Sequence, residues 1–167
     1  MPGSGKSTLA HLLARRYGAL LLSKDVIKEE LLEVFGAGDA AHSRLLSDAS
    51  FLVLFAVARQ ALAARVEVIL EGNFRPGEHE RLLPLSAALR IVQVLCRVDE
   101  PARLARLERR RQDAARRAGH GDADPAVRAE RSGDAFLELP GERLTIDGGE
   151  AADADQLEAI DRSWRGG

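Results

Sequence analysis

Residues 2–8, which read Pro-Gly-Ser-Gly-Lys-Ser-Thr, constrain this chain more than any other feature of its sequence. They match the second half of the phosphate-binding loop signature G-x-x-x-x-G-K-[ST]. Glycines at positions 3 and 5 let the backbone curl so that its N–H groups can surround phosphate oxygens. Residues 6–17 then show the apolar period of a helix, whose N-terminal end favours the same anion. The stretch therefore predicts a site for the phosphates of a nucleotide.

Each residue of this loop has an expected task. Lys6 would reach the β- and γ-phosphates as a point charge, and the Ser7 hydroxyl would ligate Mg²⁺. ATP and Mg²⁺ are therefore the predicted cofactors. The rest of the phosphate cradle would be formed by Gly3, Ser4, Gly5 and Thr8.

The signature is incomplete at its front. Its first glycine would lie five residues before Gly5, upstream of Met1, and the strand that normally leads into the loop is not in the sequence. We therefore expect a chain without the first strand of its sheet, and we expect an upstream extension to restore that strand.

Beyond the loop, short apolar runs alternate with helical patterns over the whole chain. This alternation predicts an α/β fold of three layers, with a parallel sheet between helices. At 167 residues the chain is predicted to form a single domain, residues 1–167. Strands are expected at 19–22, 66–70, 90–98 and 144–146, and helices at 6–17, 26–35, 43–64, 77–83, 125–136 and 155–164, with a further arginine-rich helix opened by Pro101.

In parallel sheets, ligands bind at the carboxyl ends of the strands, so polar residues just after each strand are site candidates. Asp25 follows the first apolar run. It would act as the base that takes a proton from a substrate hydroxyl, or it would only cap the next helix. The two roles are compatible.

Three more candidates follow the second apolar run. Glu71 would order Mg²⁺ through water, with a solvated strand-end carboxylate as the alternative. Asn73 and Arg75 would bind the substrate, since a guanidinium can hold a phosphate or carboxylate through two hydrogen bonds. A surface ion pair is the alternative for Arg75.

Seven arginines lie between positions 103 and 117, in a segment of about 103–124 that we expect to form a lid. Arg103, Arg106 and Arg110 share a helical face and are expected to be solvated. Phosphoryl transfer builds negative charge on the transferred oxygens, which an arginine from a closing lid can stabilise. The arginines predicted to do so border the small-residue stretch 118–121 and are Arg109, Arg116 and Arg117.

Composition limits the partners. The net charge of −2 gives no global attraction to nucleic acid or anionic lipid. One cysteine, Cys96, cannot form an internal disulfide, which fits a reducing, cytoplasmic setting. We find no secretory leader and no apolar run near 20 residues, and therefore expect no membrane segment. His42 and His120 have no partner at a spacing typical of a zinc site.

The chain resembles the P-loop kinase group that includes polynucleotide 5′-hydroxyl kinases, chloramphenicol phosphotransferase, gluconate kinase and zeta-toxin-like kinases. It looks most like the bacterial "AAA family ATPase" members of this group that have no assigned substrate. The residues that carry the resemblance are 2–8, 22–28 (Leu-Ser-Lys-Asp-Val-Ile-Lys), 70–76 (Leu-Glu-Gly-Asn-Phe-Arg-Pro) and 116–120 (Arg-Arg-Ala-Gly-His).

The resemblance implies a sheet of order 2-3-1-4-5, in which the expected missing strand is the central one. It also implies that Asp25 stands at the family's base position and that Asp147 and Gly148 pass near the adenine.

The resulting prediction is an ATP-dependent kinase that phosphorylates a hydroxyl of a small molecule. A polynucleotide 5′-hydroxyl kinase and a non-catalytic ATP-binding protein stay open as alternatives. The net acidity and the lack of a basic stretch with interleaved aromatics argue against the polynucleotide.

Overall fold

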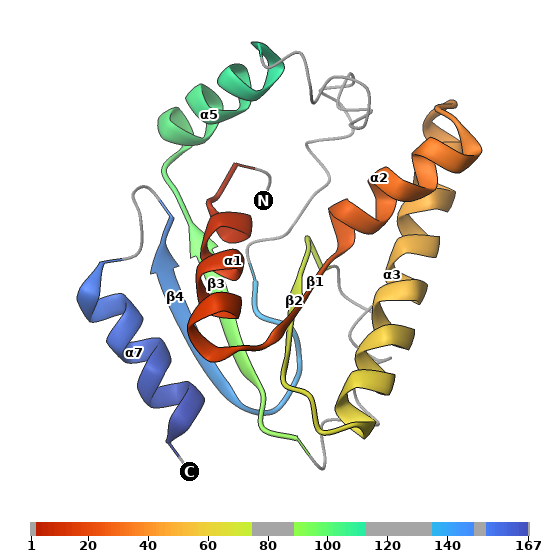
Figure 1. Ribbon diagram of the computed structural model, residues 1–167. Helices are drawn as coiled ribbons and strands as arrows, with labels where there is room; N and C mark the ends of the chain where they lie inside the picture. The colour runs from red at the N-terminus through yellow and green to blue at the C-terminus, as the bar shows by residue number, and fades with distance from the viewer. Residues whose placement is uncertain (1–2, 75–88, 113–134, 149–152, 167) are drawn as a thin grey trace. The chain divides into compact units, whose positions relative to one another are not determined.

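The computed structural model of the chain describes residues 3–74, 89–112, 135–148 and 153–166 (Figure 1). The chain divides into two compact units. The first unit comprises Met1–Leu9, Asn73–Leu107 and Ser132–Gly167, and the second comprises Ala10–Gly72 and Glu108–Arg131. The helix predicted at 77–83 lies outside the described residues. The helix predicted at 125–136 also lies outside them, except for residues 135 and 136, which are not helical.

Helix α1 (Lys6–Tyr17) begins directly at the loop lysine, as predicted. Its apolar period places Leu9, Ala10 and Leu13 on one buried stripe. Two arginines in the last turn face the negative end of the helix dipole. The helix ends at Gly18, whose φ of 67° is a left-handed conformation that glycine adopts without strain.

The second unit contains two short parallel strands joined through two helices. Strand β1 (Leu20–Ser23) leads into α2 (Lys24–Phe35), and α3 (Ala40–Ala63) leads to β2 (Val68–Glu71). The strands pair in register from Leu20 opposite Val68 to Ser23 opposite Glu71. Both strands lie slightly later in the chain than predicted, so that Ser23 and Glu71 belong to strand ends rather than to the loops that follow.

Helix α3 supplies the core of the second unit. It begins three residues earlier than predicted because Asp39 caps it: the Asp39 carboxylate accepts a hydrogen bond of 2.8 Å from the His42 backbone N–H. That bond lowers the pKa of Asp39. Two aromatic rings on the buried face, Phe51 and Phe55, stack with centroids 6.0 Å apart. The buried stripe consists of Leu46, Ser47, Ser50, Phe51, Leu54, Phe55 and Ala58.

The same helix bears on the expectation that the chain has no membrane segment. By length and composition alone, α3 is long and apolar enough to cross a membrane, whereas the sequence was expected to contain no such stretch. This is weak evidence for a membrane span, because the core helix of a soluble protein passes the same test. One face of α3 is buried, while its exposed large apolar residues are Leu45, Leu52, Val53 and Val57.

The first unit contains a second parallel strand pair. Strands β3 (Val92–Arg97) and β4 (Glu142–Asp147) pair from Val92 opposite Glu142 to Arg97 opposite Asp147. Helix α5 (Glu100–Gln112) follows β3, and α7 (Ala154–Arg165) contacts β4. A capping box between Asp153 and Gln156 starts α7. The buried apolar residues of this unit include Leu139, Ile146 and Ile160.

Parallel strands and intervening helices confirm the predicted α/β class. The strands form two separate two-stranded sheets, β1–β2 and β3–β4. The pairs β1–β2 and β3–β4 correspond to the neighbouring strands 2–3 and 4–5 of the expected order 2-3-1-4-5. The carboxyl ends of the strands, where α/β folds bind ligands, carry Ser23, Glu71, Arg97 and Asp147.

Candidate functional site

The phosphate-binding loop belongs to the first unit. Gly3 and Gly5 have φ values of 82° and 84°, so alternate residues of the loop adopt the left-handed conformation that glycine permits. This geometry turns the chain tightly into α1, where the Leu9 N–H makes an early helical hydrogen bond of 3.1 Å to the Gly5 carbonyl. Lys6 and Ser7 are half-buried and Thr8 is exposed. The predicted cradle residues therefore form one continuous turn at a helix N-terminus, where anions are favoured.

Ser4 carries the clearest sign of a binding function in this loop. Its side chain is only 2% exposed, and its Oγ has no hydrogen-bond partner within the described part of the chain. A buried hydroxyl without a partner costs free energy, so each case calls for an explanation. A phosphate oxygen would accept a hydrogen bond from this hydroxyl, so the donor chemistry of the loop fits a bound nucleotide.

The segment after β4 lies against the loop, within the same unit. A methyl group on Gly5 would lie 3.0 Å from the Gly148 carbonyl oxygen, and one on Gly148 would collide with the Ser4 carbonyl oxygen. The Gly148 N–H donates a hydrogen bond of 2.5 Å to the Arg97 carbonyl. Asp147, the last residue of β4, is exposed. The structure thus brings Gly148 next to the predicted nucleotide loop.

Arg106 corrects the prediction of a solvated arginine face on α5. Its Nη1 donates hydrogen bonds to the carbonyl oxygens of Gly3, at 3.3 Å, and of Gly148. Arg103 is also largely covered, with 16% of its side chain exposed beside Glu100. Sequence reasoning missed Arg106 because a helical period shows which arginines share a face but not what that face meets.

The second unit places two predicted residues, Asp25 and Glu71, near the ends of its paired strands. Glu71 is 5% exposed, and its Oε2 accepts a hydrogen bond of 2.6 Å from Ser23 Oγ. The alternative of a solvated strand-end carboxylate is therefore wrong. Register explains the contact: residues paired across parallel strands point to the same face of the sheet, and Ser23 is paired with Glu71.

Asp25 does not cap α2. Ser23 occupies the N-cap position, without a side-chain cap, and Asp25 lies in the first turn of the helix. The capping alternative is wrong for this reason. The Asp25 carboxylate, 37% exposed, instead lies 3.3 Å from the Nζ atom of Lys24. Lys24 is a further residue that sequence reasoning missed, although it stands in the same Ser-Lys-Asp stretch.

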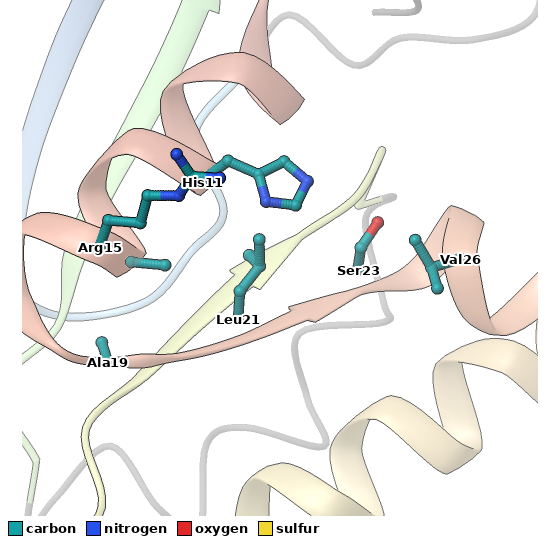
Figure 2. Close-up of a pocket in the computed structure, with 7 residues that line it drawn as sticks. His11, Arg15, Ala19, Leu21, Ser23 and Val26 are labelled. Atoms are coloured by element: carbon teal, nitrogen blue, oxygen red, sulfur yellow. The ribbon is translucent and has the colours of Figure 1, made fainter.

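A cavity of about 400 Å³ opens within the second unit. Figure 2 shows His11 and Arg15 of α1 on one side of it, with Leu21 and Ser23 of β1 on the other. Val26, which lies in the first turn of α2 and follows Asp25 in the sequence, also lines the cavity. The cavity therefore combines apolar walls with a guanidinium, an imidazole and one hydroxyl.

The remaining candidates are placed only in part. Asn73 is half-buried and belongs to the first unit, and its Oδ1 is a second buried polar atom without a partner in the described residues. Arg109 belongs to α5, but its side chain lies outside the description. Arg75, Arg116, Arg117 and residues 113–124 of the expected lid also lie outside it.

For Mg²⁺, the expected ligands have suitable chemistry. Ser7 and Glu71 offer hard oxygen atoms, and Mg²⁺ usually keeps several waters while binding one or two protein oxygens and the phosphates of its nucleotide. The described residues contain no group of three or more His, Cys, Asp or Glu side chains arranged to hold a metal ion. Taken separately, Ser7 and Glu71 each offer an oxygen atom of the kind that Mg²⁺ binds.

Comparison with known proteins identifies the family of the chain. The family model described as "AAA domain" matches residues 1–124, and the chain belongs to this family. A crystal structure described as a "putative kinase" from Chloroflexus aurantiacus is 29% identical, with a TM-score of 0.84, and the match covers 97% of this chain and 93% of that chain. No curated protein matches. The protein is therefore a P-loop kinase-type protein with a kinase-like fold.

Proposed function

We propose that the protein is an ATP- and Mg²⁺-dependent phosphotransferase that moves the γ-phosphoryl group of ATP to a hydroxyl of a small molecule. The observation that carries the proposal is the buried, unpartnered Ser4 hydroxyl, set in a loop with two left-handed glycines at the N-terminus of α1. Lys6 and the loop N–H groups would bind the phosphates, and Gly148 would lie near the adenine.

The chemistry proceeds as an in-line displacement. Asp25 would accept the proton of the acceptor hydroxyl while the acceptor oxygen forms its bond to the γ-phosphorus. The bond between the γ-phosphorus and the bridging oxygen breaks, and ADP leaves. Mg²⁺, held by Ser7 and through water by Glu71, would neutralise charge on the phosphates. Asn73 and Arg75 would hold the acceptor.

Charge on the transferred oxygens needs a further partner in the transition state. We assign this task to the lid arginines Arg109, Arg116 and Arg117, at least one of which would reach the transferred group when the lid closes. The single cysteine, Cys96, fits an enzyme that works in the cytoplasm.

A small-molecule acceptor is supported by the cavity beside β1. The depression, about 400 Å³ and open to solvent, has room for a small molecule. Two of its lining residues, Ser23 and Val26, lie within two positions of Asp25 in the sequence. Arg15 would favour an acceptor with an anionic group, and His11 offers ring nitrogens for hydrogen bonds to it. The net charge of −2 argues against a polynucleotide acceptor.

The test begins with ATP binding. ATP at 100 times its Kd should stabilise the wild type by about 2.7 kcal/mol, or about 5–11 °C in melting temperature. Lys6→Ala should lose most of this shift. Lys28→Ala, which removes the same charge from α2, should keep it. Equal shifts in wild type and Lys6→Ala would refute the phosphate-binding loop.

Transfer is then measured with ATP labelled on its γ-phosphate and a panel of acceptors. The panel contains hydroxy acids, sugar phosphates, neutral sugars and an oligonucleotide with a 5′-hydroxyl. Labelling of a small molecule supports the proposal, and labelling of the oligonucleotide alone would replace it with the polynucleotide kinase. ATP binding without transfer or hydrolysis would favour a non-catalytic nucleotide-binding protein.

A further inference from the structure

Lys24 makes a set of contacts that no prediction from the sequence assigns to it. It is the first residue of α2, and only 12% of its side chain is exposed. Its Nζ atom lies 3.3 Å from the Asp25 carboxylate, 3.2 Å from the Ser47 hydroxyl and 5.8 Å from the centroid of the Phe51 ring. The ammonium is thus enclosed by an anion, a hydroxyl and an aromatic face, which are its favourable partners.

The groups around Lys24 are themselves well fixed. Ser47 and Phe51 are 7% and 5% exposed and lie one turn apart on the buried face of α3. A methyl group on Gly72 would lie 3.2 Å from the Lys24 Cβ, so the backbone after β2 also packs closely against the lysine. An enclosed ammonium is costly without partners, so this arrangement holds Lys24 in one place. A fixed cation in contact with Asp25 then limits where that carboxylate lies.

A second lysine–serine contact between α2 and α3 provides a control for the packing contribution of Lys24. One turn farther along α2, Lys28 Nζ donates to Ser43 Oγ at 2.8 Å, one turn from Ser47 on α3. Both pairs tie α2 to α3. Lys24 in addition forms an ion pair with Asp25.

We propose that Lys24 is a positioning residue for phosphoryl transfer, holding the Asp25 carboxylate in place by a tether to Ser47 and Phe51 on α3. The inference rests on the proposed function, in which Asp25 accepts the acceptor's proton. Lys24 itself transfers no proton and touches no reacting atom. Its contribution is orientation, since a catalytic group displaced by about 1 Å can lose a large factor in rate.

The test compares five variants of the full chain: Lys24→Met, Lys24→Arg, Lys28→Met, Asp25→Asn and the double variant Lys24→Met/Asp25→Asn. Methionine keeps the apolar stem and removes the charge. The measured quantities are kcat and the KM for ATP, with hydrolysis of Mg·ATP by water as one reaction and transfer to the best acceptor of the panel as the other.

If Lys24 positions Asp25, Lys24→Met should lower kcat by about 10- to 100-fold and leave the KM for ATP within about twofold. Lys24→Arg should recover part of the loss because it restores the charge. Lys28→Met should stay near wild type. In the Asp25→Asn background, Lys24→Met should cause no further loss, because residues that act as a unit are not additive.

Two results would overturn the inference while leaving the proposed function intact. One is equal kcat for Lys24→Met and Lys28→Met, and the other is a full Lys24→Met loss on top of Asp25→Asn. An Asp25→Asn variant with wild-type kcat would instead refute the base, and the inference with it. If Lys24→Met does not fold, Ser47→Ala in the wild-type and Asp25→Asn backgrounds gives the same test, with a smaller expected loss.

Discussion

The hydrogen bond between Ser23 and Glu71 gives a sharp test of how the strand ends of the second unit are built. Ser23 Oγ donates to Glu71 Oε2 over 2.6 Å, a length typical of a hydroxyl bound to an ionised carboxylate. Glu71 is 5% exposed, so water cannot fully replace the hydroxyl. Ser23→Ala removes the donor and leaves the buried carboxylate less satisfied.

The expected cost follows from that geometry. Hydrogen bonds to charged groups contribute about 1.5–3 kcal/mol, and the loss is felt most fully where the remaining partner is buried. This corresponds to a decrease of roughly 10- to 150-fold in the folding equilibrium constant. For a chain of this size, the melting temperature should fall by about 3–12 °C.

Urea denaturation measures the free energy directly. Ser23→Ala should lower the midpoint without changing the slope, which would indicate a change in stability rather than in the compactness of either state. Ser43→Ala is the matched control, because it removes a hydroxyl from a lysine contact at a less buried place and should cost less than about 1 kcal/mol. Equal losses in the two variants would refute the argument from burial and charge.

Two further predictions concern the first unit. Gly148→Ala should reduce the ATP-induced rise in melting temperature, because its methyl group would collide with the Ser4 carbonyl and displace the loop; an unchanged rise would contradict the predicted place of Gly148. Ser163→Ala should remove a pH-dependent part of the stability, because the hydrogen bond from Ser163, followed by that from Arg90, lowers the pKa of Glu142 below 4.5. A lowered pKa contributes stability above the unfolded value, and this is lost as the pH falls through the folded value. The difference between wild type and variant in urea should therefore be full at pH 7 and shrink below about pH 4.5; a difference independent of pH would contradict this cause.

Features that depend on residues close together in the sequence could be predicted from the sequence alone. The glycines of the phosphate loop, the start of α1 at Lys6 and its end before Gly18 depend on backbone conformations that neighbouring residues determine. The alternation of apolar runs and helical patterns likewise indicated parallel strands, because strands buried on both faces are continuously apolar. Element bounds were less well predicted, and β2 extends to Glu71 because its last pairing partner is Ser23.

The partners of the site residues were decided by tertiary structure. Ser23 meets Glu71 across 48 positions, Lys24 meets Ser47 across 23, and Arg106 meets Gly3 across 103. Such contacts depend on strand register and on the rotation of each helix about its axis, which periodicity leaves open. For this reason the sequence indicated a phosphate loop and an acidic strand end. Only the fold showed that the carboxylate of Glu71 is buried, that Asp25 is held by Lys24, and that an arginine expected in solvent binds the loop.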